Sequence, residues 1–144
     1  MSICVLMADS ETRENLQGLL AELQLEVVAA ASSSVYRNLA RERRFAVVIC
    51  DTKLPDGSWV DVFETLTHEE APSFIVTSRL ADDRLWVDVL HRGAYDVLVQ
   101  PFDRSEVARV ISLASDGYRR RREDANSVVG PSRSKGPIRR AAVA

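Results

Sequence analysis

The chain has 144 residues, of which 46% are hydrophobic and 28% are charged, and this composition is typical of one soluble globular domain. No apolar run approaches the roughly 18 residues of a membrane-spanning helix, and the N-terminus lacks the basic region of a signal peptide, so we expect a cytoplasmic protein. The net charge of −2 conceals an asymmetry: residues 119–144 carry eight basic and two acidic residues, whereas the preceding 118 residues carry 11 basic and 19 acidic.

The only two cysteines, Cys4 and Cys50, lie inside apolar runs that have the pattern of strands. We expect both to be reduced, buried thiols that pack as small hydrophobic side chains. Without histidines nearby, two cysteines make no pattern of a metal site.

Five short apolar runs alternate along the chain with segments of helical periodicity. The runs predict strands at residues 3–7, 26–30, 45–50, 73–77 and 96–99. In the first helical segment, the leucines from Leu16 to Leu23 are spaced so that they share one helix face. In the second, the same spacing predicts that Val35 and Leu39 face inward.

Residues that commonly cap helices precede the other predicted helices. These candidate caps are Ser32–Ser34, Ser58, Asp82 and Asp103. Asp103 forms a pattern similar to a capping box with Glu106. We expect the third helix to end near Thr67 and the last helix near Arg122.

Strands that alternate with helices predict right-handed βαβ crossovers and an α/β sandwich of three layers. Residues 1–122 fill one such domain, and a doubly wound parallel sheet of order 2-1-3-4-5 makes it flavodoxin-like. From residue 123 onward Ser, Gly, Pro and Arg become frequent and the periodicity is lost. We therefore expect residues 123–144 to be a basic, disordered tail.

Polar residues stand at the carboxyl ends of four predicted strands, namely Asp9, Asp51, Thr77 and Gln100. In a parallel sheet of this order, ligands bind outside the carboxyl ends, so we expect these residues to surround one pocket. Two acids with a backbone carbonyl and waters suit Mg²⁺, a hard octahedral ion. With phosphate as the ligand, Asp51 can act as a nucleophile that forms an acyl phosphate.

Three stretches now make the sequence resemble the receiver domain of bacterial two-component response regulators, over about residues 3–118. They are Asp51–Gly57 (DTKLPDG), Phe74–Arg79 (FIVTSR) and Leu90–Phe102 (LHRGAYDVLVQPF). The resemblance implies that Asp51 is the phospho-acceptor and that Thr77 is the switch hydroxyl that follows the phosphoryl group. It also implies that Asp9, Asp51 and the backbone carbonyl of Lys53 bind Mg²⁺.

The sequence departs from the family pattern at three positions. The family has two adjacent acids after the first strand, but here the loop looks one residue short and Asp9 is the best single match, which predicts weakened Mg²⁺ binding. Gln100 replaces the family lysine and brings no charge, although Lys53 and Arg79 flank the pocket. Val97 replaces the switch aromatic, and Tyr95 lies two residues earlier.

The resemblance leaves two functions open. In the first, the chain is a single-domain response regulator of a phosphorelay, in which a histidine kinase or phosphotransfer protein phosphorylates Asp51. A downstream protein, or a second copy of the chain, then binds the face formed by helix four, strand five and helix five. No enzymatic activity is expected beyond the phosphorylation chemistry at Asp51. In the second, the chain is a degenerate receiver that acts as a protein-interaction module independently of phosphorylation.

A third and less favoured function is contact with nucleic acid through the basic residues Arg119–Arg122 and Arg139-Arg140. The tail has no aromatic residue on which a base could stack. A solvated helix end with a flexible tail explains the same charges.

Overall fold

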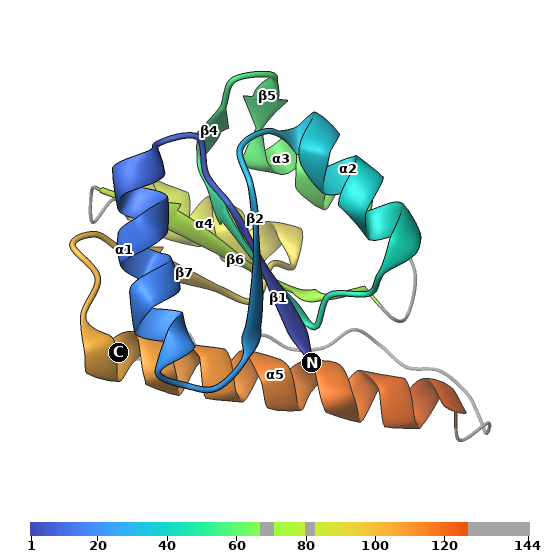
Figure 1. Ribbon diagram of the computed structural model, residues 1–144. Coiled ribbons are helices and arrows are strands. Elements are labelled where there is room, and N and C mark those ends of the chain that lie inside the picture. The colour runs from blue at the N-terminus through green and yellow to red at the C-terminus, as the bar shows by residue number, and fades with distance from the viewer. Residues whose placement is uncertain (67–70, 80–82, 127–144) are drawn as a thin grey trace.

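Five parallel strands form one sheet between two layers of helices in the computed structural model of the chain (Figure 1), which describes residues 1–66, 71–79 and 83–126. The strands of this sheet are β1 (Ser2–Leu6), β2 (Glu26–Ala30), β3 (Val47–Asp51), β6 (Ser73–Ser78) and β7 (Asp96–Val99). The helices are α1 (Ser10–Ala21), α2 (Ser33–Glu42), α3 (Trp59–Phe63), α4 (Asp83–Arg92) and α5 (Arg104–Asn126). The strand order β2-β1-β3-β6-β7 confirms the predicted doubly wound topology.

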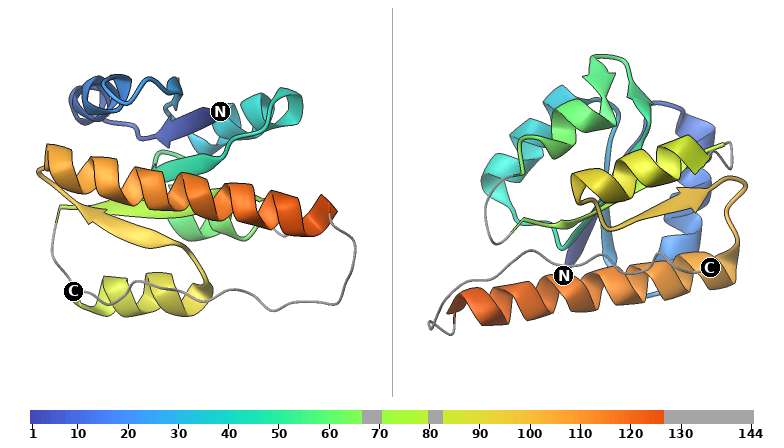
Figure 2. Two further views of the ribbon diagram at one scale, coloured as in Figure 1. Left: turned by 90° about the horizontal axis from the view of Figure 1, so that it is seen from below. Right: turned by 180° about the vertical axis from the view of Figure 1, so that it is seen from behind.

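The central strands are apolar along their whole length because both of their faces are buried. Side chains such as Ile49 and Ile75 pack against α1 and α5, whereas their neighbours Cys50 and Val76 pack against α2, α3 and α4. Figure 2 shows these two helical layers on opposite faces of the sheet. This two-sided burial explains why unbroken apolar runs, rather than alternating ones, predicted the strands.

Both cysteines are free and buried within the sheet, as predicted. Burial raises the pKa of the Cys4 thiol to about 12 and also raises the pKa of the Cys50 thiol. Both side chains therefore pack as small hydrophobes and are not reactive thiolates at neutral pH.

Helix α2 buries only one of its two predicted inward residues, because Leu39 packs against the core and Val35 does not. Val35 is 42% exposed, so its predicted inward orientation is wrong, whereas Tyr36 is only 3% exposed and packs in the core. The helix begins after Ser32, whose hydroxyl accepts a hydrogen bond from the Val35 backbone N–H. This cap sets the phase of the helix and directs Tyr36, rather than Val35, towards Phe45.

The segment after Asp51 forms a hairpin where the sequence predicted only a turn. Strand β4 (Lys53–Leu54) pairs antiparallel with β5 (Gly57–Ser58), and α3 follows directly. The predicted cap Ser58 lies at the start of α3, but this helix ends at Phe63, earlier than predicted. The predicted helix end Thr67 and the predicted cap Asp82 lie outside the described residues.

Helix α5 continues to Asn126, four residues beyond its predicted end. Two contacts hold its last turns on the sheet: Tyr118 is buried, and the Arg121 guanidinium donates hydrogen bonds to the carbonyl of Ala71 and the hydroxyl of Ser73. Residues 127–144 of the predicted tail lie outside the described part of the chain. None of the described helices is both long and apolar enough to cross a membrane.

Candidate functional site

Asp51 stands at the carboxyl end of β3, next to Thr77 on β6. The two residues are partners in the parallel register, and the Thr77 hydroxyl lies 3.5 Å from Oδ1 of Asp51, the limit of a weak hydrogen bond. The backbone N–H of Thr52 donates to the same oxygen at 2.9 Å. Oδ2 of the half-buried Asp51 therefore has no hydrogen-bond donor among the described residues. The structure brings together the predicted acceptor and the predicted switch hydroxyl.

Asp9 lies on the same edge of the sheet, but it serves as the N-cap of α1. Its Oδ2 accepts hydrogen bonds from the backbone N–H of Thr12 at 2.9 Å and from the Thr12 hydroxyl at 2.6 Å. These bonds lower the pKa of the exposed Asp9 carboxyl, with smaller contributions from Arg79 and Arg13. Capping thus engages one oxygen of the carboxylate that the sequence predicts as a metal ligand.

The position level with Asp51 on the neighbouring strand belongs to Met7, not to an acid. Leu6 pairs with Cys50 in the parallel register, so the next residue, Met7, stands beside Asp51. Met7 is fully buried in the core that includes α1 and α5, and Ala8 after it is exposed. The β1–α1 loop therefore brings a thioether and a methyl group to the edge of the sheet before the first acid appears.

This donor set does not fit Mg²⁺, an ion that receivers of this kind commonly bind. Mg²⁺ prefers six oxygen ligands in near-ideal octahedral geometry. The described residues contain no cluster of three or more His, Cys, Asp or Glu side chains that could hold a metal ion. The predicted set therefore consists of two carboxylates, Asp9 and Asp51, each with one oxygen already hydrogen-bonded, and the backbone carbonyl of the exposed Lys53.

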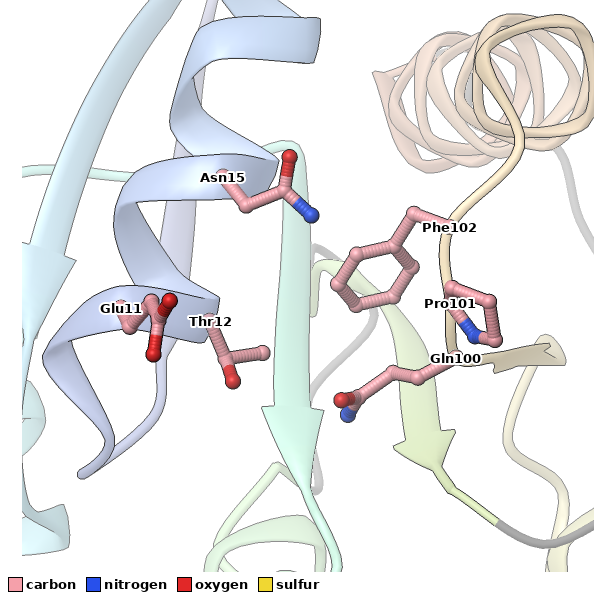
Figure 3. Close-up of a pocket in the computed structure, with 6 residues that line it drawn as sticks. All are labelled: Glu11, Thr12, Asn15, Gln100, Pro101 and Phe102. Carbon is pink, nitrogen blue, oxygen red and sulfur yellow. The ribbon is translucent and has the colours of Figure 1, made fainter.

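Gln100 follows β7 and borders an open cleft of about 260 Å³. The other residues of this cleft come from α1 and from the β7–α5 loop, and are Glu11, Thr12, Asn15, Pro101 and Phe102. Figure 3 shows the Gln100 amide extending from the end of β7 towards the first turn of α1. Gln100 therefore brings a neutral amide, in place of a cation, to a cleft whose lining does not include Asp51 or Thr77.

Neither Val97, which occupies the position of the family's switch aromatic, nor the nearby Tyr95 extends to the site. Val97 is buried inside β7. Tyr95 precedes β7, and its hydroxyl donates a hydrogen bond to the carbonyl of Leu113 on α5 at 3.1 Å. Tyr95 therefore fastens α5 to the amino end of β7, opposite the edge that carries Asp51.

Asp56 has a role that the sequence analysis missed. Its carboxylate oxygens accept hydrogen bonds from the backbone N–H groups of Ser33 and Ser34, at 3.0 and 3.1 Å, in the first turn of α2. These bonds lower the pKa of Asp56. The only local signal was an Asp in a turn, because its partners lie more than 20 residues away. The hairpin after Asp51 is thereby tied to α2.

The basic end of α5 is partly engaged within the chain. Arg119 pairs with Asp116 at 2.8 Å, Arg122 lies over the ring of Tyr118, and Arg121 is bonded to β6 as described above. These contacts reduce the number of arginines that nucleic acid could reach on the described part of the chain.

The sequence matches the family model of the response regulator receiver domain over residues 3–112. Among curated proteins, it is 27% identical over 108 residues to the response regulator protein PilR of Pseudomonas aeruginosa, covering 74% of this chain and 24% of PilR. It is 27% identical over 133 residues to the transcriptional regulatory protein FixJ of Azorhizobium caulinodans, covering 90% of this chain and 63% of FixJ. The chain therefore spans from about a quarter to less than two thirds of the length of these relatives.

Solved structures share the fold. A putative response regulator from Chloroflexus aurantiacus superposes with a TM-score of 0.74 at 20% identity, over 80% of this chain and 97% of that one. The chemotaxis response regulator CheY4 of Vibrio cholerae superposes with a TM-score of 0.70 at 16% identity, over 78% and 97%. The family match over most of the chain, together with this fold, shows that the protein belongs to the response regulator receiver domains, the signalling modules of two-component systems.

Proposed function

We propose that this receiver domain is a protein-docking module whose output does not depend on phosphorylation of Asp51. The observation that carries the proposal is the fully buried Met7 at the position level with Asp51. Phosphoryl transfer relies on positioning and on neutralisation of the charge on the transferred group. At this edge Met7 is apolar, Asp9 caps α1 and Gln100 is neutral. The edge is therefore poorly equipped both to position a phosphoryl group and to neutralise its charge.

The docking face of this module consists of α4, β7 and α5, which lie side by side in the right-hand view of Figure 2. Two large apolar side chains are exposed on its helices: Val87 on α4 is 67% exposed and Leu113 on α5 is 44% exposed. Exposed apolar side chains of this kind favour contact with another protein. The partner is a downstream protein in the cytoplasm, and a second copy of the chain is the alternative occupant.

A second candidate function is phosphoryl acceptance at Asp51, and the free Oδ2 together with the Thr77 hydroxyl favours it. In that reaction a bond forms between an Asp51 oxygen and phosphorus while the bond to the phosphohistidine nitrogen of a histidine kinase or phosphotransfer protein breaks. Thr77 then bonds the phosphoryl group, and Gln100 donates a neutral hydrogen bond. This function calls for Mg²⁺ at Asp9, Asp51 and the Lys53 carbonyl, the set that fits the ion poorly.

The two functions are separated by treating the full chain with Mg²⁺ and acetyl phosphate, and separately with beryllofluoride. We expect no mass gain of a phosphoryl group and no change in the amide NMR signals around Asp51. A phosphoryl adduct on the wild type that Asp51→Asn lacks would establish the second function instead.

Partner binding is measured on the same proteins, with a partner captured by the immobilised full chain and then identified. We expect equal affinity for wild type and Asp51→Asn, and at least tenfold weaker binding for Val87→Asp, because a buried charge in the interface is costly.

A further inference from the structure

Helix α4 carries part of the proposed docking face but has little buried anchorage of its own. Of its ten residues, Val89 alone is fully buried, whereas Leu85 and Trp86 are partly buried against the core. By contrast, the neighbouring α5 contributes buried apolar side chains over three turns, from Val107 to Tyr118. The orientation of α4 on the domain therefore depends on contacts besides its one buried side chain.

Arg92, the last residue of α4, links this helix to α3. Its Nε lies 2.8 Å from Oδ1 of Asp88, one turn earlier on α4, and its Nη1 lies 3.8 Å from Oε2 of Glu64, the C-cap of α3. Its Cζ also lies over the ring of Trp59 on α3, 5.9 Å from the ring centroid, where the face of an indole attracts a cation. One guanidinium is therefore in contact with two carboxylates and one aromatic ring, on both helices.

The ring beneath Arg92 belongs to the core. Trp59 is 4% exposed, and its ring centroid lies 6.0 Å from that of Phe63 on α3 and 6.3 Å from that of Phe74 on β6. The two helices also meet at Gly93, which follows α4 with a φ of +101° and where a Cβ would lie 3.9 Å from Cζ of Phe63. The guanidinium thus rests on an aromatic cluster that joins α3 to the sheet.

These contacts lie away from the candidate acceptor. Arg92 comes shortly before β7, whose amino end is opposite the edge that carries Asp51. In the right-hand view of Figure 2, α4 lies between α3 and α5. A contact that fixes α4 on α3 therefore also fixes the position of its exposed Val87 in the docking face.

We propose that Arg92 is a brace that holds α4 in one orientation on α3, so that the docking face keeps its binding geometry without a signal from Asp51. The inference rests on the proposed function, since a module that docks independently of phosphorylation needs its docking helix fixed in advance. Arginine suits this role because it stays protonated at all physiological pH values, and because its planar group can pair with carboxylates and stack on a ring. Arg92 is thus a positioning residue that acts through the orientation of α4.

The first test removes the cation from the full chain. In Arg92→Gln we expect hydrogen exchange of the amides in residues 87–93 to accelerate by about tenfold, while the amides of residues 47–51 in the central strand keep their protection. Arg92→Lys should recover part of the protection, because an ammonium keeps the charge but not the planar contact with the indole. Arg109→Gln, which removes an exposed arginine of α5, is the matched control and should leave these amides unchanged.

The second test uses salt, which screens ion pairs between exposed groups more strongly than it affects core packing. The Arg92 side chain is 40% exposed, so its ion pairs are open to screening. In the wild type we expect exchange in residues 87–93 to accelerate by about threefold from low salt to about 1 M NaCl. In Arg92→Gln this acceleration should be absent, whereas in Arg109→Gln it should match that of the wild type.

Equal exchange of residues 87–93 in Arg92→Gln and Arg109→Gln would overturn the brace. If Arg92→Gln does not fold, the salt dependence of the wild type decides, and exchange that stays unchanged at high salt counts against the proposal. Asp51→Asn should leave exchange in α4 as it is in the wild type, and a change there would also contradict the proposal. The partner affinity of Asp51→Asn tests the proposed function itself, so a failure of the brace is distinguishable from a failure of phosphorylation-independent docking.

Discussion

The centre of the carboxyl edge and its two flanks carry different kinds of side chain. At the centre, Asp51 and Thr77 keep an acceptor carboxylate and a hydroxyl on paired positions of β3 and β6. On the flanks, β1 is followed by Met7 and Ala8, and β7 is followed by Gln100. The central strands are buried on both faces, which fixes their register. On the flanks, Met7 is fully buried, whereas Ala8 is exposed and Gln100 lies in a loop. The comparison teaches that the receiver fold and the Asp51–Thr77 pair do not by themselves establish the charges that phosphoryl transfer needs.

The largest expected effect on stability comes from the central strand. Replacing the fully buried Ile49 by Ala should lower the free energy of unfolding by about 2–5 kcal/mol, because the cavity lies between β3 and two helices. Urea denaturation followed by circular dichroism measures this loss. Ala8→Gly in the flanking loop is the control, and a loss of similar size there would contradict the distinction between centre and flanks.

Charges added to the flanks should restore chemistry without affecting the fold. In Ala8→Asp combined with Gln100→Lys, we expect acetyl phosphate to label Asp51 detectably where the wild type is not labelled, since the two substitutions add an acid and a charged hydrogen-bond donor to the edge. Intact-protein mass spectrometry measures the labelling. The same double variant carrying Asp51→Asn must stay unlabelled, and unchanged labelling in the double variant would show that further residues prevent the reaction.

The tie between the hairpin and α2 should depend on pH through Asp56. Its pKa is lowered in the folded protein, so its stabilising effect is complete above the ordinary value of 3.8 and is lost as the pH falls through the folded pKa. We expect Asp56→Ala to lower Tm by about 3 °C at pH 7 and to differ little from wild type near pH 2.5. Glu14→Gln, which alters an exposed carboxyl of α1, controls for net charge. A Tm difference for Asp56→Ala that persists at low pH would contradict this role.

The smallest expected effect concerns the Thr77 hydroxyl. Because its hydrogen bond to Asp51 is long, Thr77→Val should change the free energy of unfolding by less than about 1 kcal/mol. Chemical denaturation measures the change. A loss above about 2 kcal/mol would mean that the centre of the site is more tightly coupled than the 3.5 Å contact indicates.

Much of the fold was predictable because it depends on patterns within short segments. Unbroken apolar runs ending at Asp51 and Thr77 indicated buried parallel strands, and their alternation with helices indicated the sheet order. The predicted cap at Asp103 is also confirmed, since its carboxylate accepts a hydrogen bond from the backbone N–H of Glu106 at 2.9 Å. The orientation of α2 was less predictable. Val35 was expected to face the core, but the neighbouring Tyr36 is buried there instead, in a helix that begins after the cap at Ser32.

The pairing of Asp51 with Thr77 was predictable from the strand ends, but the surroundings of the pair were not. The sequence identified Asp51, Thr77 and Gln100 at the strand ends, and it identified Asp9 as an acid without showing that Thr12 engages it. The hydrogen bonds from the Arg13 guanidinium to the carbonyls of Met7 and Ala8 depend on how the chain turns back after β1, which no local pattern encodes.

The sequence by itself determined the layers, the strand order and the identity of the candidate acceptor, because burial on both faces of a sheet leaves an apolar signature in each strand. The tertiary structure decided what surrounds that acceptor. Strand register placed Met7 beside Asp51, the α1 cap engaged Asp9, and the guanidinium of Arg13 entered the loop. These features depend on the relative positions of different segments at the scale of a hydrogen bond, and only the packed fold sets those positions.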